Sequence, residues 1–222
     1  MSPITEPDPI RVSPDAAKRE LRTLRLVVMS AAHQLNNVLS GLMGYADLEA
    51  EEADGPSPAF VQMVLEHSES GVQLAQALMN VAARSYGRKE TVSPAEPLED
   101  VLTVSAKYLA NRNVTLQADW GELPTCTMDV GAVRQALLDV VLSAVAIMPM
   151  GGSLAADAKA DDAFAHIQLT AQPVDRAAAN EWFDLSTAEQ IVAEHAGRFA
   201  ADYPDDHTLR VSLSLPLPTE PE

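Results

Sequence analysis

Hydrophobic residues in the first third of the chain recur at intervals of three and four positions. Glycine and proline are absent after Pro14 until Gly41, and the intervening apolar positions are Leu21, Leu24, Val28, Ala31, Leu35, Val38, Leu42 and Tyr45. This spacing predicts a long helix that packs at a shallow angle against other helices. Turn-forming residues at positions 54–58 predict its end.

A second periodic segment runs from Ala59 to about Tyr86. It predicts a second helix with an apolar stripe formed by Val61, Val64, Leu65, Val72, Ala75, Leu78, Met79 and Ala82. The two helices together predict a hairpin over residues 15–86. Two continuous stripes cannot bury each other alone, so we expect a homodimer in which two hairpins form a four-helix bundle. Coverage of the stripe by the rest of the same chain is the alternative.

The pattern changes after Gly87. Helical periodicity appears at 96–110, 130–148 and around 186–194, and alternating, strand-like segments appear at 113–120, 153–160, 164–172, 197–203 and 208–217. This order predicts an α+β domain over residues 87–218, with one sheet of antiparallel-type strands covered by helices on one face. The ends, residues 1–14 and 219–222, are rich in proline and acid and are expected to be disordered tails.

Charge and cysteine content narrow the possible partners and compartment. The chain has 32 acidic and 15 basic residues, a net charge of -17 that would repel a nucleic-acid backbone. No apolar run approaches the roughly 18 residues of a membrane-spanning helix. A single cysteine, Cys126, rules out an internal disulfide. We therefore expect a cytoplasmic protein that binds neither nucleic acid nor membrane.

The chemically distinctive positions lie on the first predicted helix. On a helical wheel centred on Leu35, the side opposite the apolar stripe carries His33, Asn37, Ser40 and Gly44. An imidazole is a competent nucleophile near neutral pH because its ordinary pKa is about 6.5. The amide of Asn37, one turn later, can bind a phosphoryl oxygen or orient a water molecule. His33 and Asn37 are therefore the candidate catalytic residues.

The run from Ala32 to Leu48 resembles the phosphoacceptor helix of sensor histidine kinases. The residues that carry the resemblance are His33, Asn36, Asn37, Leu39, Gly41, Gly44, Tyr45 and Leu48. The resemblance implies a dimeric hairpin in which His33 carries the phosphoryl group and Asn37 helps to position water for dephosphorylation of the partner. It also implies a receiver-binding surface around the site, made of Gln34, Asn36, Ser40, Gly41 and Gly44.

One position of this helix departs from the family pattern. Histidine kinases usually carry Glu or Asp directly after the histidine, where it can act as a general base during autophosphorylation. This chain has Gln34, and a neutral amide cannot accept that proton at pH 7.

Residues 133–154 resemble the part of kinase catalytic domains that carries an asparagine needed for Mg-ATP, followed by a Met-Pro-x-Gly-Gly turn. Ser143, a shorter and weaker metal ligand, stands at the position of that asparagine, and Asp139 precedes it by four residues. The stretch 171–191 contains no glycine, so it makes a poor phosphate loop. The resemblance thus implies a degenerate ATPase-like domain, without cofactor or metal, in which His195 is structural.

These features predict a histidine phosphotransfer protein of a two-component phosphorelay. It would shuttle a phosphoryl group between His33 and receiver-domain aspartates without binding ATP, and Mg²⁺ would be needed only in the receiver's own acidic pocket. Three alternatives remain open from the sequence. They are a pseudokinase-like adaptor, a receiver phosphatase that uses Asn37 or Gln34, and an ATP-dependent kinase with unusual loops.

Overall fold

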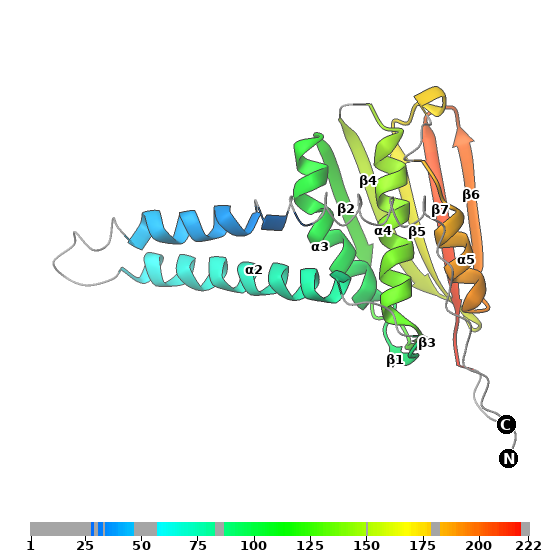
Figure 1. The fold of residues 1–222 in the computed structure, drawn as a ribbon, viewed down its shortest axis with the longest axis horizontal. Helices are drawn as coiled ribbons and strands as arrows, with labels where there is room; N and C mark the ends of the chain where they lie inside the picture. Colours follow the sequence, from blue (N-terminus) through cyan, green and yellow to red (C-terminus); the bar gives the residue numbers. More distant parts are fainter. Residues whose placement is uncertain are drawn as a thin grey trace, which may run out of the picture.

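The computed structural model describes residues 28, 31–32, 34–46, 57–82, 87–149, 151–178 and 183–218. In these residues a helical hairpin projects from one side of an α/β domain (Figure 1). His33 and the predicted tails, residues 1–14 and 219–222, lie outside the described residues.

The hairpin pairs the first helix, described as helical at 34–46, with α2 (Pro58–Ala82) (Figure 1). The side chain of Ser57 accepts a hydrogen bond from the Phe60 N–H at 3.2 Å, which satisfies one of the free amides at the start of α2. Gly71 is buried at the contact between the helices, where an added Cβ would lie 3.4 Å from a methyl group of Val38. The predicted hairpin is therefore present, and a glycine lets its helices approach closely.

The buried side of α2 differs from the predicted stripe. Gly71, Leu74 and Ala77 are buried, whereas four residues of the predicted stripe are 45 to 69% exposed, namely Val61, Leu65, Val72 and Met79. These four exposed residues belong to the predicted stripe, but the side of α2 that packs within one chain is a different one, because α2 carries apolar residues around more than one face. Periodicity then finds a helix without showing which face the neighbouring helix covers.

The α/β domain contains a five-stranded sheet with strand order β2-β4-β5-β7-β6. Its strands are β2 (Val114–Trp120), β4 (Gly152–Ala160), β5 (Phe164–Gln172), β6 (Arg198–Asp205) and β7 (Thr208–Pro216). β2 and β4 run parallel, and the other neighbouring pairs run antiparallel. The expectation of antiparallel-type strands alone is therefore wrong at β2, because a helix crosses over between β2 and β4 and returns the chain in the same direction.

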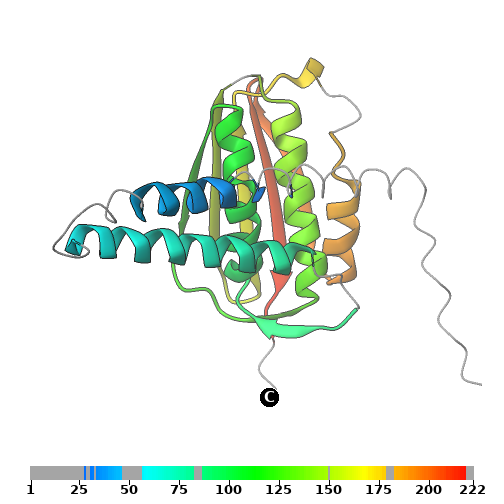
Figure 2. The same ribbon diagram turned by 60° about the vertical axis from the view of Figure 1, so that its left-hand side comes forward.

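Three helices cover one face of this sheet, namely α3 (Ala95–Asn111), α4 (Val130–Ala146) and α5 (Ser186–Glu194) (Figure 2). Side chains of β5 alternate between buried and partly exposed, as a strand with one covered face requires. The central helix α4 is the most enclosed, and Leu137, Leu138 and Val141 are completely buried. The α+β fold class is confirmed. No described helix is long and apolar enough to cross a membrane.

A small two-stranded sheet, formed by β1 (Glu90–Val92) and β3 (Cys126–Met128), is not predicted from the sequence. Each strand has three residues, which is too short for alternation to be recognised. The thiol of Cys126 is buried in β3, and desolvation raises its pKa, so it is poorly reactive. A single 3-10 turn, η1 (Arg176–Ala178), follows β5.

Candidate functional site

The outward side of the first helix carries small and polar residues. Asn37, Ser40 and Gly44 are exposed, as the helical wheel predicts, and Asn36 is exposed beside them. His33 lies outside the described residues. The exposed polar residues that follow it in the sequence therefore offer amide and hydroxyl groups to an approaching molecule.

Two other predicted partner-binding residues, Gln34 and Gly41, are less accessible. Both are half-buried. A Cβ added to Gly41 would lie 4.0 Å from Nε2 of His67 on α2, so Gly41 belongs to the contact between the two helices. The Oε1 atom of Gln34 is buried and has no hydrogen-bond partner among the described residues. The amide of Asn37 is thus better placed than that of Gln34 to meet a group arriving from solvent.

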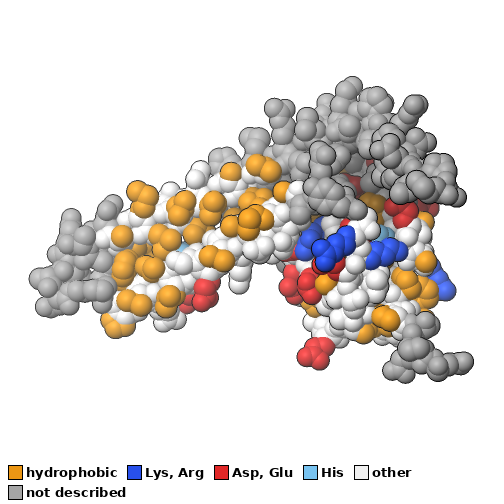
Figure 3. Space-filling model, turned by 60° about the horizontal axis from the view of Figure 1, so that its bottom comes forward, with side chains coloured by type: hydrophobic (Ala, Val, Ile, Leu, Met, Phe, Trp, Pro, Cys, Tyr) orange, Lys and Arg blue, Asp and Glu red, His pale blue; other side chains and the backbone are white. Residues whose placement is uncertain are grey.

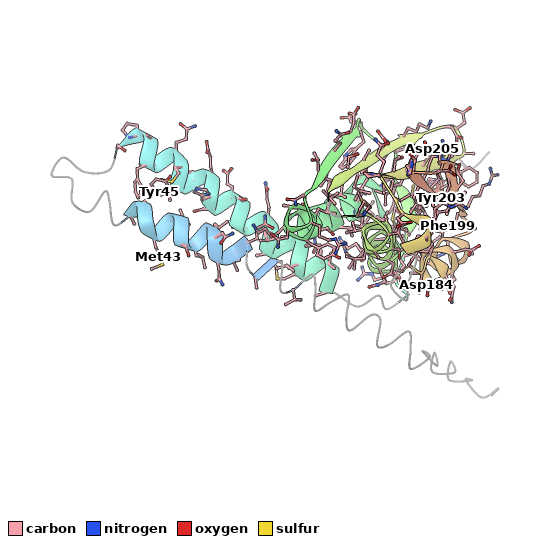
Figure 4. The ribbon with its side chains drawn as sticks, turned by 90° about the horizontal axis from the view of Figure 1, so that it is seen from above. Met43, Tyr45, Asp184, Phe199, Tyr203 and Asp205 are labelled. Atoms are coloured by element: carbon pink, nitrogen blue, oxygen red, sulfur yellow. The ribbon has the colours of Figure 1, made fainter. Side chains whose placement is uncertain are left out.

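Large apolar side chains accompany these polar groups on the hairpin. Leu39, Met43 and Tyr45 are 46 to 68% exposed, and hydrophobic side chains gather along the hairpin surface (Figure 3). Met43 and Tyr45 lie toward the end of the hairpin that is far from the α/β domain (Figure 4). An exposed surface of mixed apolar and amide groups is typical of contact with another protein rather than with a small ligand.

The position that resembles a nucleotide-site asparagine lies at the other end of the molecule, in α4. Ser143 is 3% exposed. Its hydroxyl donates to the carbonyl oxygen of Asp184 at 2.9 Å and lies 3.3 Å from the Asp184 amide nitrogen, which donates to it. The flanking residues Phe183 and Leu185 pack against the hydrophobic core. The chain itself therefore engages the hydroxyl that would have to bind a metal.

Asp139 offers no better ligand. It is half-buried on α4, and its carboxylate accepts a hydrogen bond from the side-chain amide of Gln135 at 2.8 Å. After β5 the backbone forms the turn η1. The next described residue, Phe183, packs against the hydrophobic core. The polar groups of both Ser143 and Asp139 are thus engaged within the chain.

His195 connects the end of α5 to the start of α4. It is 7% exposed. Its Nε2 accepts a hydrogen bond from the Asp129 N–H at 2.9 Å, and its Nδ1 lies 2.7 Å from the Ile191 carbonyl oxygen. Because a carbonyl only accepts, Nδ1 donates to it while Nε2 accepts from the backbone. These bonds tie α5 to the start of α4, as the prediction of a structural role for His195 requires.

A second histidine, His166, has partners that the sequence analysis did not find. Its Nδ1 lies 2.8 Å from the Ser214 hydroxyl, and its Nε2 lies 3.0 Å from a carboxylate oxygen of Asp161. The hydrogen bond from His166, followed by those from the backbone N–H groups of Ala163 and Phe164, lowers the pKa of Asp161 from 3.8 to about 2.

This chain of hydrogen bonds ties the turn between β4 and β5 to β7. Ser214 is only 8% exposed and lies opposite His166 in the register of β5 and β7, so it is not presented to a substrate. The contact between His166 and Ser214 follows from the register of β5 and β7, which cannot be read from the sequence.

Comparison with known proteins gives a consistent picture for the fold. No protein-family model matches the chain. The chain is 31% identical over 137 residues to the sensory histidine kinase/phosphatase NtrB of Escherichia coli O157:H7, and equally to that of Shigella flexneri. The match covers 59% of this chain and only 37% of each relative.

Solved structures of histidine kinases share the fold. The catalytic domain of histidine kinase ThkA matches with a TM-score of 0.51 at 12% identity, over 58% of this chain and 96% of that one. A histidine kinase from Burkholderia phymatum STM815 matches with a TM-score of 0.51 at 16% identity, over 93% of this chain and 99% of that one. The described part of the chain is therefore similar in fold to these histidine kinase structures, and its α+β domain has the fold of the ThkA catalytic domain.

Proposed function

We propose that this protein is a histidine phosphotransfer protein that receives a phosphoryl group on His33 from a receiver aspartate and passes it to another receiver. The observation that carries the proposal is the contrast between the two candidate sites. Beside His33, the exposed first helix offers the amide of Asn37. In α4, the hydroxyl of Ser143 is hydrogen-bonded to the backbone of Asp184.

Transfer from an aspartyl phosphate is compatible with Gln34 at the position where histidine kinases usually carry Glu or Asp. The unprotonated imidazole nitrogen of His33 attacks the phosphorus, and the bond between phosphorus and the aspartate oxygen breaks. The leaving group is a carboxylate with an ordinary pKa of about 3.9, which needs no proton at pH 7. The return step reverses these events. The leaving carboxylate therefore needs no acidic neighbour as a proton donor, and the proton on the other ring nitrogen of His33 can be lost to water.

We propose that two chains associate through their hairpins into a four-helix bundle. A single chain leaves a second apolar stripe of α2 exposed, formed by Val61, Leu65, Val72 and Met79. A contiguous apolar surface of this kind is normally covered by another protein surface. A second copy supplies the same stripe, and a symmetric dimer lets each stripe meet its equivalent.

Receiver domains are the partners that fit this chemistry. The curated relatives are named as sensory histidine kinase/phosphatases, and the proposed reaction needs an aspartyl phosphate as donor and an aspartate as acceptor. Mg²⁺ would be bound by the receiver's own carboxylates. A buried free thiol, Cys126, fits the reducing environment of the cytoplasm.

The decisive test compares two phosphoryl donors. The protein is incubated with radiolabelled ATP alone, and separately with a receiver labelled on its aspartate. We expect label from the receiver only, and loss of that label in His33→Ala. The matched control is His207→Ala, which removes a histidine at an exposed turn far from the hairpin. Labelling of His33→Ala by the receiver would refute the proposal, and labelling from ATP alone would favour a kinase.

The exposure of Asn37 favours a second candidate function, dephosphorylation of the receiver. An exposed amide can orient a water molecule toward an aspartyl phosphate. In that case the receiver loses its label without transfer to His33, and Asn37→Ala slows the loss while His33→Ala does not. If neither transfer nor loss of label occurs, a receiver-binding adaptor is the better account.

A further inference from the structure

The end of α2 is packed onto the α/β domain. Ala77 is 3% exposed and belongs to the core that the α/β domain builds, and Leu78 and Val81 pack against that core. Figure 2 shows the last turns of α2 crossing beside α3. The hairpin therefore joins the domain through a packed contact in addition to the connecting chain.

A carboxylate lies at the centre of this contact. Both oxygens of Asp100, on α3, lie 3.1 Å from the side-chain nitrogen of Asn80 on α2, which donates to them. Nε of Arg134, on α4, donates to Asp100 at 2.7 Å. The side chains of Arg134 and Asp100 are only 14% and 16% exposed. One acid thus joins three helices from both parts of the molecule.

A fourth side chain fixes the orientation of the amide. Gln76, one turn earlier on α2, donates to Oδ1 of Asn80 at 3.0 Å. Oδ1 therefore accepts from Gln76 while the nitrogen donates to Asp100, and a flipped amide would lose both interactions. Hydrogen bonds to a carboxylate in a poorly hydrated place are stronger than those between neutral groups. The arrangement favours one position of α2 on α3.

We infer that Asn80 and Asp100 form a lock that holds the hairpin and the α/β domain as one rigid body. The lock lies on the same helix as the contact between the two helices of the hairpin. Val38 of the first helix packs at Gly71, and Asn80 lies nine positions after Gly71, about 14 Å along α2. The α/β domain then serves as a fixed brace for the hairpin.

The consequence for phosphotransfer rests on the proposed function. A receiver that docks on the hairpin would meet a surface whose shape is set before binding, so less conformational freedom is lost when the complex forms. The lock would thus lower the conformational cost of docking, while its own residues stay outside the chemistry.

The test measures the distance between the two parts with spin labels. Cysteines are introduced by Glu69→Cys on α2 and Asp206→Cys in the turn between β6 and β7, both exposed positions. Cys126 is 1% exposed and its pKa is raised by burial, so it should not react with the label. Labelled chain is diluted with an excess of unlabelled chain to suppress distances between subunits. We expect one narrow distance distribution.

Asn80→Asp places a carboxylate against that of Asp100 while the Asp100–Arg134 pair stays intact. We expect the narrow distribution to be lost and replaced by a broad one, with the circular dichroism of the α/β domain unchanged. Asn80→Ala removes the donor without adding repulsion and should broaden the distribution less. The control, Gln73→Glu, adds the same charge at an exposed position of α2 and should leave the distribution narrow.

A broad distribution in the unmodified protein, or a narrow one in Asn80→Asp, would overturn the lock. These outcomes are independent of the phosphotransfer assay. A narrow distribution lost in Asn80→Asp, together with no label on His33 from any receiver, would leave the lock standing and reject the proposed function.

Discussion

The hairpin and the α/β domain differ in how much of their apolar side chains is exposed. Every large hydrophobic side chain that is strongly exposed among the described residues belongs to the hairpin, namely Val28, Leu39, Met43, Tyr45, Val61, Leu65, Val72 and Met79. In the α/β domain the core side chains of α3, α4 and the sheet are almost completely buried. The core of the domain is therefore covered within one chain, whereas the hairpin leaves an apolar surface that the proposed dimer would cover.

Polar groups do not divide in the same way. In the α/β domain, buried His195 and Ser143 find their partners within the chain, but Ser105 and Arg112 each carry a buried atom without a hydrogen-bond partner among the described residues. On the hairpin, the buried oxygen of Gln34 also has no partner among the described residues. The contrast between the two parts therefore rests on their apolar side chains.

The largest expected effect is on association through the hairpin. Leu65→Glu combined with Val72→Glu places two charges in the exposed stripe of α2, and burying them in a dimer would be very unfavourable. We expect the dimer to become a monomer in sedimentation experiments, with the thermal unfolding of the α/β domain unchanged. Ser70→Glu with Gln73→Glu adds the same charge at exposed polar positions of α2 and should keep the dimer. An unmodified protein that sediments as a monomer would contradict the proposed bundle.

The second effect is on the core of the α/β domain. Leu138 is completely buried in α4, so Leu138→Ala should lower the free energy of unfolding by about 2 to 5 kcal/mol through lost burial and a cavity. Urea denaturation followed by circular dichroism measures this change. Leu138→Met, which nearly conserves volume, should cost less than about 1.5 kcal/mol. Equal costs for the two variants would mean that the core is less tightly packed than the structure indicates.

The smallest effect is electrostatic and concerns Asp161. Its pKa is about 2 in the folded protein and 3.8 ordinarily, so its contribution to stability is present above pH 3.8 and is lost as the pH falls toward 2. Asp161→Asn should therefore flatten the fall in melting temperature over this acidic range. The neighbouring exposed residue provides a control, Asp162→Asn, which should leave the slope unchanged. An unchanged slope in Asp161→Asn would mean that the bond to His166 does not persist in solution.

Much of the fold can be predicted from the sequence because its elements are long and periodic. The boundaries of α5 and β5 agree with the predicted segments 186–194 and 164–172. The short strands β1 and β3 and the parallel pairing of β2 with β4 could not be predicted, because they depend on contacts between residues distant in the chain. The covered face of α2 could not be predicted for the same reason, because it also depends on contacts between residues distant in the chain.

The candidate sites were predictable to different extents. The exposure of Asn37, Ser40 and Gly44 follows from their place opposite the apolar stripe. The shortness of Ser143 is evident from the sequence, but its two bonds to Asp184 required the structure. The Asn80–Asp100–Arg134 cluster joins three helices, and its members lie 20 and 34 positions apart along the chain. No local pattern indicates such a cluster.

The way in which Ser143 is held bears on what a nucleotide site in α4 would require. Ser143→Asn would supply an amide, but its longer side chain would enter the place where the hydroxyl meets both backbone groups of Asp184. That substitution would break two hydrogen bonds, which typically contribute about 0.5 to 1.5 kcal/mol each. A glycine-bearing loop would also have to replace residues 171–191, which contain no glycine. Neither change alone would supply the site, so the two would have to be made together.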